Sequence, residues 1–145
     1  MVKKVLFVCK HNLFRSQVAK TFFNRHNKNK KYSGEGAGVI KWDKKDLVSN
    51  MGFRTERKIS KEYGINLKGD SRGLSSSVLK KIDILVVVAD NVHPSIFKKD
   101  RAFNGKLIVW KIADVKDNDK NKEKIAHKTI NFIENKIKGL VKNLK

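Results

Sequence analysis

The sequence lacks the residues that mark disulfide-bonded, membrane-spanning or linker-joined proteins. Its one cysteine, Cys9, excludes an internal disulfide and a cysteine-rich zinc site. Its one proline, Pro94, leaves no proline-rich linker. The longest apolar run, residues 84–89, is far shorter than the roughly 20 residues of a membrane span, and the first apolar stretch is too short for a signal peptide. We therefore expect one soluble cytoplasmic domain, residues 1–145, with no membrane partner.

Acidic residues are also scarce. The sequence has 14 Asp and Glu against 34 Lys and Arg, which gives a net charge of +20. Such a field attracts nucleic acid or phosphorylated substrates. The lysines are scattered, however, and aromatic residues are not interleaved with them as in a groove that binds single strands. Lysine enrichment also accompanies biased genome composition and growth at high temperature. Nucleic-acid binding is therefore an alternative that charge alone does not favour.

The pattern of apolar residues predicts strands that alternate with helices. Short apolar runs predict strands at residues 4–8, near 32, at 82–89 and at 106–112. Helical spacing predicts helices at residues 15–27, about 54–63 with Gly64 as the stop, 75–81 and 122–144. This alternation is typical of parallel βαβ units and an open α/β sheet. Ligands of such sheets bind beyond the carboxyl ends of the strands, which directs attention to the end of the first one.

The only thiol follows that first strand. Cys9 is separated by five residues from Arg15 and Ser16, where the first helix is expected to begin. A loop of this length can aim several backbone N–H groups at one anion at a helix N-terminus. Arg15 can hold two oxygens of that anion, and Ser16 can donate its hydroxyl to the sulfur. These groups favour a Cys9 thiolate that attacks a phosphoryl group. A buried structural cysteine is the alternative interpretation.

The sequence resembles the low-molecular-weight protein tyrosine phosphatases, a family that shares its fold with thioredoxin-coupled arsenate reductases. The resemblance covers nearly the whole chain, in the following segments: Cys9 to Ser16 with Asn12 inside the loop, Gly36-Ala37-Gly38, Trp42, residues 63–67, residues 83–88, and Trp110 to Asp114. It implies a flavodoxin-like fold with an open, four-stranded parallel sheet in the order 2-1-3-4 and helices on both faces. It also implies a hydrolase that acts through a phosphocysteine, without a metal or cofactor, on phosphotyrosine proteins or aryl phosphates.

The resemblance assigns roles to particular residues. Cys9, Arg15, Ser16 and Asp114 are expected to be catalytic. The loop that binds phosphate or another oxyanion would consist of Lys10, His11, Asn12, Leu13 and Phe14. Trp42 is expected to form a wall of the substrate pocket, with ordinary core packing as its alternative. Asp114 follows the fourth strand at the edge where Cys9 lies, but Asp117 and Asp119 share its loop, and Asp117 is an alternative general acid.

Some positions depart from the family pattern. Phe14 stands where many members have a second cysteine, and His11 replaces a glycine that a positive φ would favour. Gln17 and Val115 each replace a proline. Two alternative functions remain open, namely an arsenate reductase that uses an external thiol and a non-catalytic module that binds phosphate or nucleic acid. We expect the phosphatase to act as a monomer.

Overall fold

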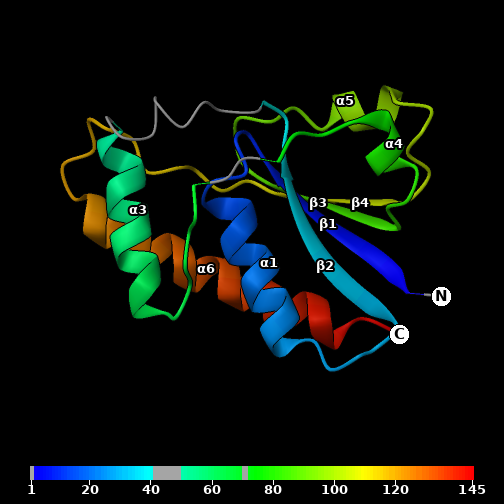
Figure 1. Ribbon diagram of the computed structural model, residues 1–145, viewed down its shortest axis with the longest axis horizontal. Coiled ribbons are helices and arrows are strands. Elements are labelled where there is room, and N and C mark those ends of the chain that lie inside the picture. Colours follow the sequence, from blue (N-terminus) through cyan, green and yellow to red (C-terminus); the bar gives the residue numbers. More distant parts are fainter. Residues whose placement is uncertain (1, 41–49, 70–71) are drawn as a thin grey trace.

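The computed structural model describes residues 2–40, 50–69 and 72–145. In these parts of the chain, four parallel strands form one sheet: β1 (Lys3–Cys9), β2 (Tyr32–Gly38), β3 (Ile84–Val88) and β4 (Lys106–Trp110). Their order is β2-β1-β3-β4, which confirms the predicted order (Figure 1). The central strands β1 and β3 carry the most apolar segments because both faces of each are covered.

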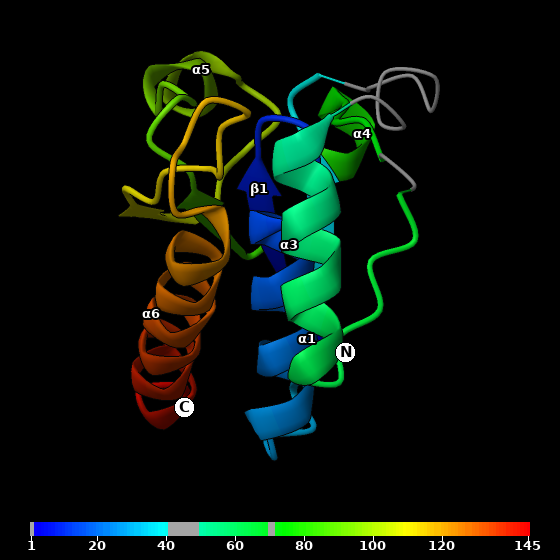
Figure 2. The same cartoon turned by 90° about the vertical axis from the view of Figure 1, so that its left-hand side faces the viewer.

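Helices lie on both faces of the sheet, as expected. On one face, α1 (Arg15–His26) packs against the strands and against α6 (Lys122–Lys142), and α3 (Met51–Glu62) packs against α6 (Figures 1 and 2). Two short helices, α4 (Ser76–Leu79) and α5 (Ser95–Lys99), contribute Leu79 and Phe97 to the core on the other face. Successive residues of β1 supply the two cores in turn, so that Phe7 joins the first and Val8 the second.

Two helices differ from the sequence prediction. Helix α3 begins at Met51, three residues before the predicted start, because the side chain of Asn50 accepts a hydrogen bond from the Phe53 N–H and caps the first turn. Helix α5 was not predicted, since five residues are too few for a helical period to be visible. The predicted stop of α3 is confirmed, because Gly64 has a φ of 72°.

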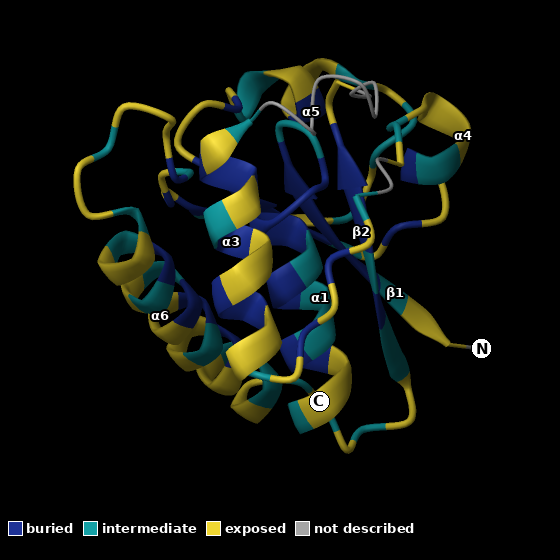
Figure 3. Ribbon diagram, turned by 60° about the vertical axis from the view of Figure 1, so that its left-hand side comes forward, coloured by how far each residue is buried: buried dark blue, intermediate teal, exposed yellow. Residues whose placement is uncertain are grey.

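Helix α6 covers the sheet with one apolar stripe and presents its lysines outward. Ala126, Ile130, Ile133 and Ile137 are buried, and the opposite side of the helix is largely exposed (Figure 3). The apolar residues whose 3.6-residue period predicted this helix are therefore the residues through which it packs against the core. Across the described ranges of the chain, no helix combines the length and the apolar character needed to cross a membrane.

Candidate active site

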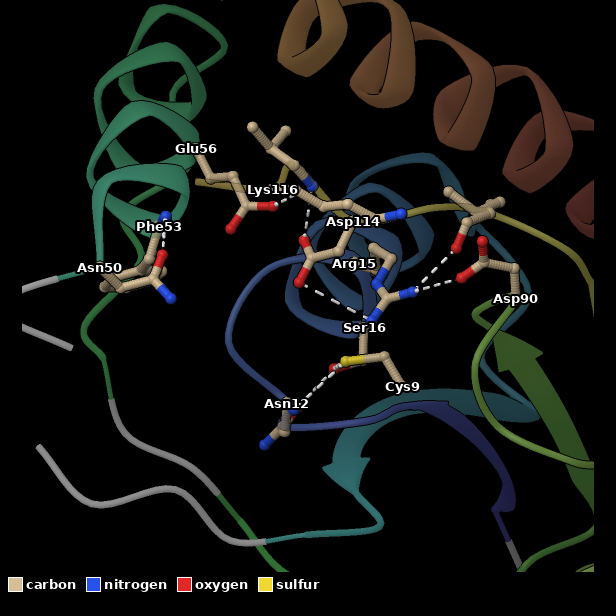
Figure 4. Close-up of polar contacts among 12 residues, drawn as sticks. Cys9, Asn12, Arg15, Ser16, Asn50, Phe53, Glu56, Asp90, Asp114 and Lys116 are labelled. Atoms are coloured by element: carbon tan, nitrogen blue, oxygen red, sulfur yellow. Dashed lines mark hydrogen bonds and ion pairs between the residues drawn. The ribbon is translucent and has the colours of Figure 1, made fainter. Parts of the chain in front are cut away.

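The loop after β1 wraps around the sulfur of Cys9, which is 2% exposed at the centre of the sheet edge. The Asn12 N–H donates a hydrogen bond to Cys9 Sγ at 3.2 Å, and the Cys9 thiol donates to Ser16 Oγ at 3.1 Å (Figure 4). The Ser16 hydroxyl donates to Asn12 Oδ1 at 2.7 Å. Once the thiol is ionised, Ser16 becomes a possible donor to the sulfur. The loop is thus held together by contacts that converge on the one thiol.

The loop turns back on the sulfur through Asn12 rather than His11. Asn12 has a φ of 58°, the left-handed conformation that asparagine tolerates better than most residues. The turn also needs a glycine on the neighbouring strand, because a Cβ on Gly38 would lie 2.6 Å from the carbonyl carbon of His11. A Cβ on Gly36 would lie 2.9 Å from Asn12 Oδ1. Strand β2 therefore carries glycines where the loop packs against it.

Arg15 is buried at the start of α1, with 2% of its surface exposed. Its Nη1 donates a hydrogen bond to the carbonyl of Ile112 at 2.8 Å and lies 3.5 Å from Asp90 Oδ1. Its Nη2 lies 3.8 Å from Asp114 Oδ2. The segments that follow β3 and β4 therefore fix the guanidinium at the sheet edge where Cys9 lies (Figure 4).

The three acids of the segment after β4 occupy different environments. Asp114 contacts Arg15, as described, and lines the cleft beside the loop. Asp117 accepts a hydrogen bond from the Gly52 N–H at 2.9 Å, in the first turn of α3. Asp119 accepts from the Lys116 N–H at 2.7 Å within its own turn. Asp117 also lines the cleft, but its carboxylate binds the start of α3, whereas that of Asp114 contacts Arg15.

A cleft of about 430 Å³ opens beside the loop. Its lining comes from the loop, from α3 and from the segments after β3 and β4, namely Lys10, His11, Leu13, Asn50, Phe53, Glu56, Asp90, Asn91, Asp114, Val115, Lys116 and Asp117. The side chain of Phe14 instead packs into the hydrophobic core, so Phe14 contributes only its backbone to the loop. Trp42, the predicted wall, lies outside the described residues, and Phe53 is an aromatic residue of the lining that the sequence analysis did not single out.

Two titratable groups of the cleft have shifted pKa values. Burial, and then the neighbouring charge of Lys10, lower the pKa of His11, so His11 is neutral at neutral pH. Burial and the adjacent Asp114 carboxyl raise the pKa of Glu56 well above its ordinary value. Glu56 is only 2% exposed and accepts a hydrogen bond from the Val115 N–H at 3.2 Å.

Glu56 was not among the predicted site residues, although the sequence carries a signal for it. Glu56 lies three residues after Phe53 and three before Ile59, both of which are buried, and so it falls on the apolar face of α3. A glutamate on such a face needs a partner inside the protein. Among the residues that the structure describes, no group of three or more His, Cys, Asp or Glu side chains is arranged to hold a metal ion.

Comparisons with known proteins were made for the sequence and for the structure. The sequence model of the low molecular weight phosphotyrosine protein phosphatase family matches residues 4–145. No curated protein matches the chain. An arsenate reductase from Archaeoglobus fulgidus has 25% identity and a TM-score of 0.68, and the alignment covers 96% of this chain and 99% of that one.

Two further solved structures share the fold at lower identity. A low molecular weight protein tyrosine phosphatase from T. tengcongensis has 23% identity and a TM-score of 0.69, with 98% of this chain and 99% of that chain covered. Wzb from Vibrio vulnificus, in complex with benzylphosphonate, has 19% identity and a TM-score of 0.72, with coverages of 99% and 100%.

Proposed function

Because the chain belongs to the low molecular weight phosphotyrosine protein phosphatase family, we propose that it hydrolyses aryl phosphate monoesters with Cys9 as the nucleophile. The observation that carries this proposal is the loop that gathers the Asn12 N–H and the Ser16 hydroxyl around the Cys9 sulfur. The thiolate is the reactive form of a cysteine, and in that form the sulfur accepts from the Asn12 N–H. Arg15 lies at the same edge and supplies the charge that a phosphoryl group requires.

In the first step, the Cys9 thiolate attacks phosphorus in line with the ester oxygen. A P–S bond forms as the P–O bond breaks, and Asp114 donates a proton to the departing oxygen. The loop N–H groups and Arg15 hold the phosphoryl oxygens in position during the transfer. The 3.8 Å contact between Arg15 and Asp114 supports this assignment, because it brings the acid beside the group that binds the phosphate.

In the second step, water hydrolyses the phosphocysteine. The Asp114 carboxylate takes a proton from the water, whose oxygen bonds to phosphorus while the P–S bond breaks. Ser16 stabilises the departing thiolate by donating its hydroxyl. The products are inorganic phosphate and the enzyme in its starting state, so the cycle needs no metal and no redox cofactor.

The cleft favours an aromatic substrate. Leu13 and Phe53 provide apolar surface next to the loop, and Lys10 and Lys116 provide positive charge. This combination suits the ring and the phosphate of phosphotyrosine. The Vibrio vulnificus structure was solved with benzylphosphonate, which likewise joins an aromatic ring to an anionic phosphorus group.

Replacing the proposed general acid should produce a loss that depends on the leaving group. For Asp114→Asn, we expect kcat/KM on phenyl phosphate to fall by about 100-fold or more, because phenolate needs a proton to leave. On p-nitrophenyl phosphate the loss should be less than about tenfold, because nitrophenolate leaves without one. Steady-state kinetics on both substrates provide the measurement.

Asp117→Asn is the matched control, since Asp117 caps α3 in the same segment. Any loss in this variant should be the same on both substrates. Equal losses on the two substrates in Asp114→Asn would argue for a structural role of Asp114. A loss that depends on the leaving group in Asp117→Asn would instead move the acid to that residue.

Arsenate reduction is the second candidate, because the Archaeoglobus fulgidus relative is an arsenate reductase. Release of arsenite from a cysteine adduct requires another thiolate, and the chain has one cysteine. We therefore expect steady multiple turnover on aryl phosphates, and no arsenite above background with arsenate and thioredoxin. Sustained thioredoxin-dependent consumption of NADPH on addition of arsenate, without aryl phosphatase activity, would establish the reductase instead.

We also propose that the protein acts in the cytoplasm, because a thiol nucleophile is kept reduced there. We propose likewise that the protein acts as a monomer, because β1, α1, α3 and the segment after β4 together supply the loop, Arg15, Glu56 and Asp114.

A further inference from the structure

The mechanism above leaves one buried carboxyl unused. Glu56 Oε2 accepts a hydrogen bond from the Val115 N–H at 3.2 Å, and Asp114 Oδ1 accepts from the same N–H at 3.1 Å. Because one oxygen of each group accepts from the same N–H, the two carboxyl groups lie side by side. Figure 4 shows the two side chains next to each other, Glu56 reaching in from α3 and Asp114 from the segment after β4. Two neighbouring carboxyl groups, one of them buried, repel each other when both are charged, and one shared proton removes that repulsion.

We propose that Glu56 and Asp114 form a carboxyl pair that shares one proton, in which Glu56 is a positioning residue that keeps this proton available to Asp114. The proposal rests on the proposed function, in which Asp114 protonates the leaving group. Glu56 does not touch the substrate in this scheme and acts only through Asp114. Asp114 is the member of the pair that also contacts Arg15, with Oδ2 3.8 Å from Nη2.

The proton count of the pair follows the two chemical steps. Before the reaction the pair holds one proton, which passes to the ester oxygen as the P–O bond breaks. The pair then carries two negative charges, which lie beside Arg15 and the Val115 N–H. In the second step the pair takes one proton from the attacking water, whose oxygen replaces sulfur on phosphorus. The pair ends with one proton, ready for the next cycle.

The charges and the burial around the two carboxyls determine whether the pair keeps its proton at neutral pH. The charged or titratable groups that face it from the packed elements are Arg15, Lys10, His11, Asp90, Lys116 and Asp117. Burial acts most strongly on Glu56 and raises its pKa, and the Asp114 carboxyl raises it further. The Val115 N–H and Arg15 lower it by smaller amounts, so the pKa of Glu56 stays well above its ordinary value. The raised pKa therefore supports retention of one proton by the pair.

A purely structural role for Glu56 makes a different prediction. Glutamine at position 56 can still accept from the Val115 N–H through its carbonyl oxygen and donate to Asp114 through its amide. It therefore preserves the anchor but has no transferable proton. Glu56→Gln separates the two roles, since only the shared proton is lost.

The test is the pH profile of kcat/KM on phenyl phosphate, which reports the groups of the free enzyme. In the wild type we expect an alkaline limb where the pair loses its proton. In Glu56→Gln this limb should move to lower pH by about one unit or more, while the acidic plateau stays unchanged. Above the limb, kcat/KM then falls by about tenfold for each unit of displacement. The loss above the limb should be smaller on p-nitrophenyl phosphate, because nitrophenolate leaves without a proton.

Glu62→Gln is the matched control, because it removes a carboxyl from the last residue of α3, where Glu62 is exposed and contacts His127. Its pH profile should follow the wild type. An alkaline limb that does not move in Glu56→Gln, in a folded variant with normal activity on the plateau, would overturn the proposal and leave Glu56 as an anchor.

Infrared spectroscopy tests the shared proton without relying on activity. At neutral pH we expect a protonated-carboxyl band in the wild type that is absent from Glu56→Gln, is retained in Glu62→Gln and shifts in Asp114→Asn. No such band in the wild type would overturn the carboxyl pair even if the enzyme is active. A wild-type protein that has the band but shows no Cys9-dependent hydrolysis would refute the proposed function, and with it the catalytic role of the pair.

Discussion

Cys9→Ser should lower kcat on p-nitrophenyl phosphate by about four to six orders of magnitude, the scale on which loss of a covalent nucleophile acts. The serine hydroxyl fits the same position, but it is not ionised at neutral pH and is a poor leaving group from phosphorus. The sulfur in this protein receives the Asn12 N–H and lies next to Ser16, so the loop is built around that atom. Stopped-flow and long-duration assays together cover the required range of rates.

The same variant should still bind the anion. The loop N–H groups and Arg15 are untouched by Cys9→Ser, so inorganic phosphate and vanadate should bind with affinities close to those of the wild type. Calorimetric titration measures this, and unfolding midpoints establish that the loop still folds. Hydrolysis that survives in Cys9→Ser at the wild-type rate would eliminate the cysteine mechanism and leave the protein as a hydrolase that works by a different mechanism.

Arg15→Lys should reduce kcat/KM by about 100- to 1,000-fold, comparable with the loss of one strong donor from an oxyanion site. Lysine retains the charge but has one short cluster of donors instead of a planar fork. It cannot bind the Ile112 carbonyl at 2.8 Å and also hold two phosphoryl oxygens. Steady-state kinetics and phosphate titration should both register the loss, since the fork serves binding as well as the transition state.

Arg25→Lys provides a matched comparison on the same helix. Arg25 is exposed and donates to the carbonyl of Tyr63 at 3.0 Å, away from the loop. Its replacement should leave kcat/KM at the wild-type value. If Arg15→Lys behaved in the same way, the buried guanidinium would have only a structural task, and the proposed phosphate clamp would have to be abandoned.

Local patterns in the sequence were enough to predict the frame of the protein. The apolar run of β3 and the period of α6 indicated a buried strand and a one-sided helix, because burial on two faces or one imposes those patterns directly. The loop from Cys9 to Ser16 was equally visible, since all of its residues are consecutive. Their catalytic roles remain predictions that the variants above test.

The missing parts of the site depend on contacts between distant segments. Glu56 accepts a hydrogen bond from the Val115 N–H, 59 positions away in the sequence. No local pattern predicts which group will bind a glutamate that lies on the apolar face of a helix. Phe53 was not predicted as a cleft residue for a similar reason. Its position depends on where α3 begins, and that start is fixed by the Asn50 cap and by the contact with the distant Asp117. The proposal of Asp114 rather than Asp117 as the general acid likewise rests on a long-range contact, because Asp117 accepts a hydrogen bond from the Gly52 N–H.

The bond between Arg15 and the Ile112 carbonyl also has a consequence for how the protein is made. It joins residues 97 positions apart, and contacts of such long range form late because a large loop must close first. At about 5–20 residues per second, the ribosome adds the second partner roughly 5–20 s after the first. During that interval the emerging chain already contains the complete loop around Cys9, but the Ile112 carbonyl that binds Arg15 and the proposed general acid Asp114 have not been synthesised. On the proposed mechanism, the nascent chain therefore gains hydrolytic activity only after the segment that follows β4 reaches the sheet edge beside Cys9.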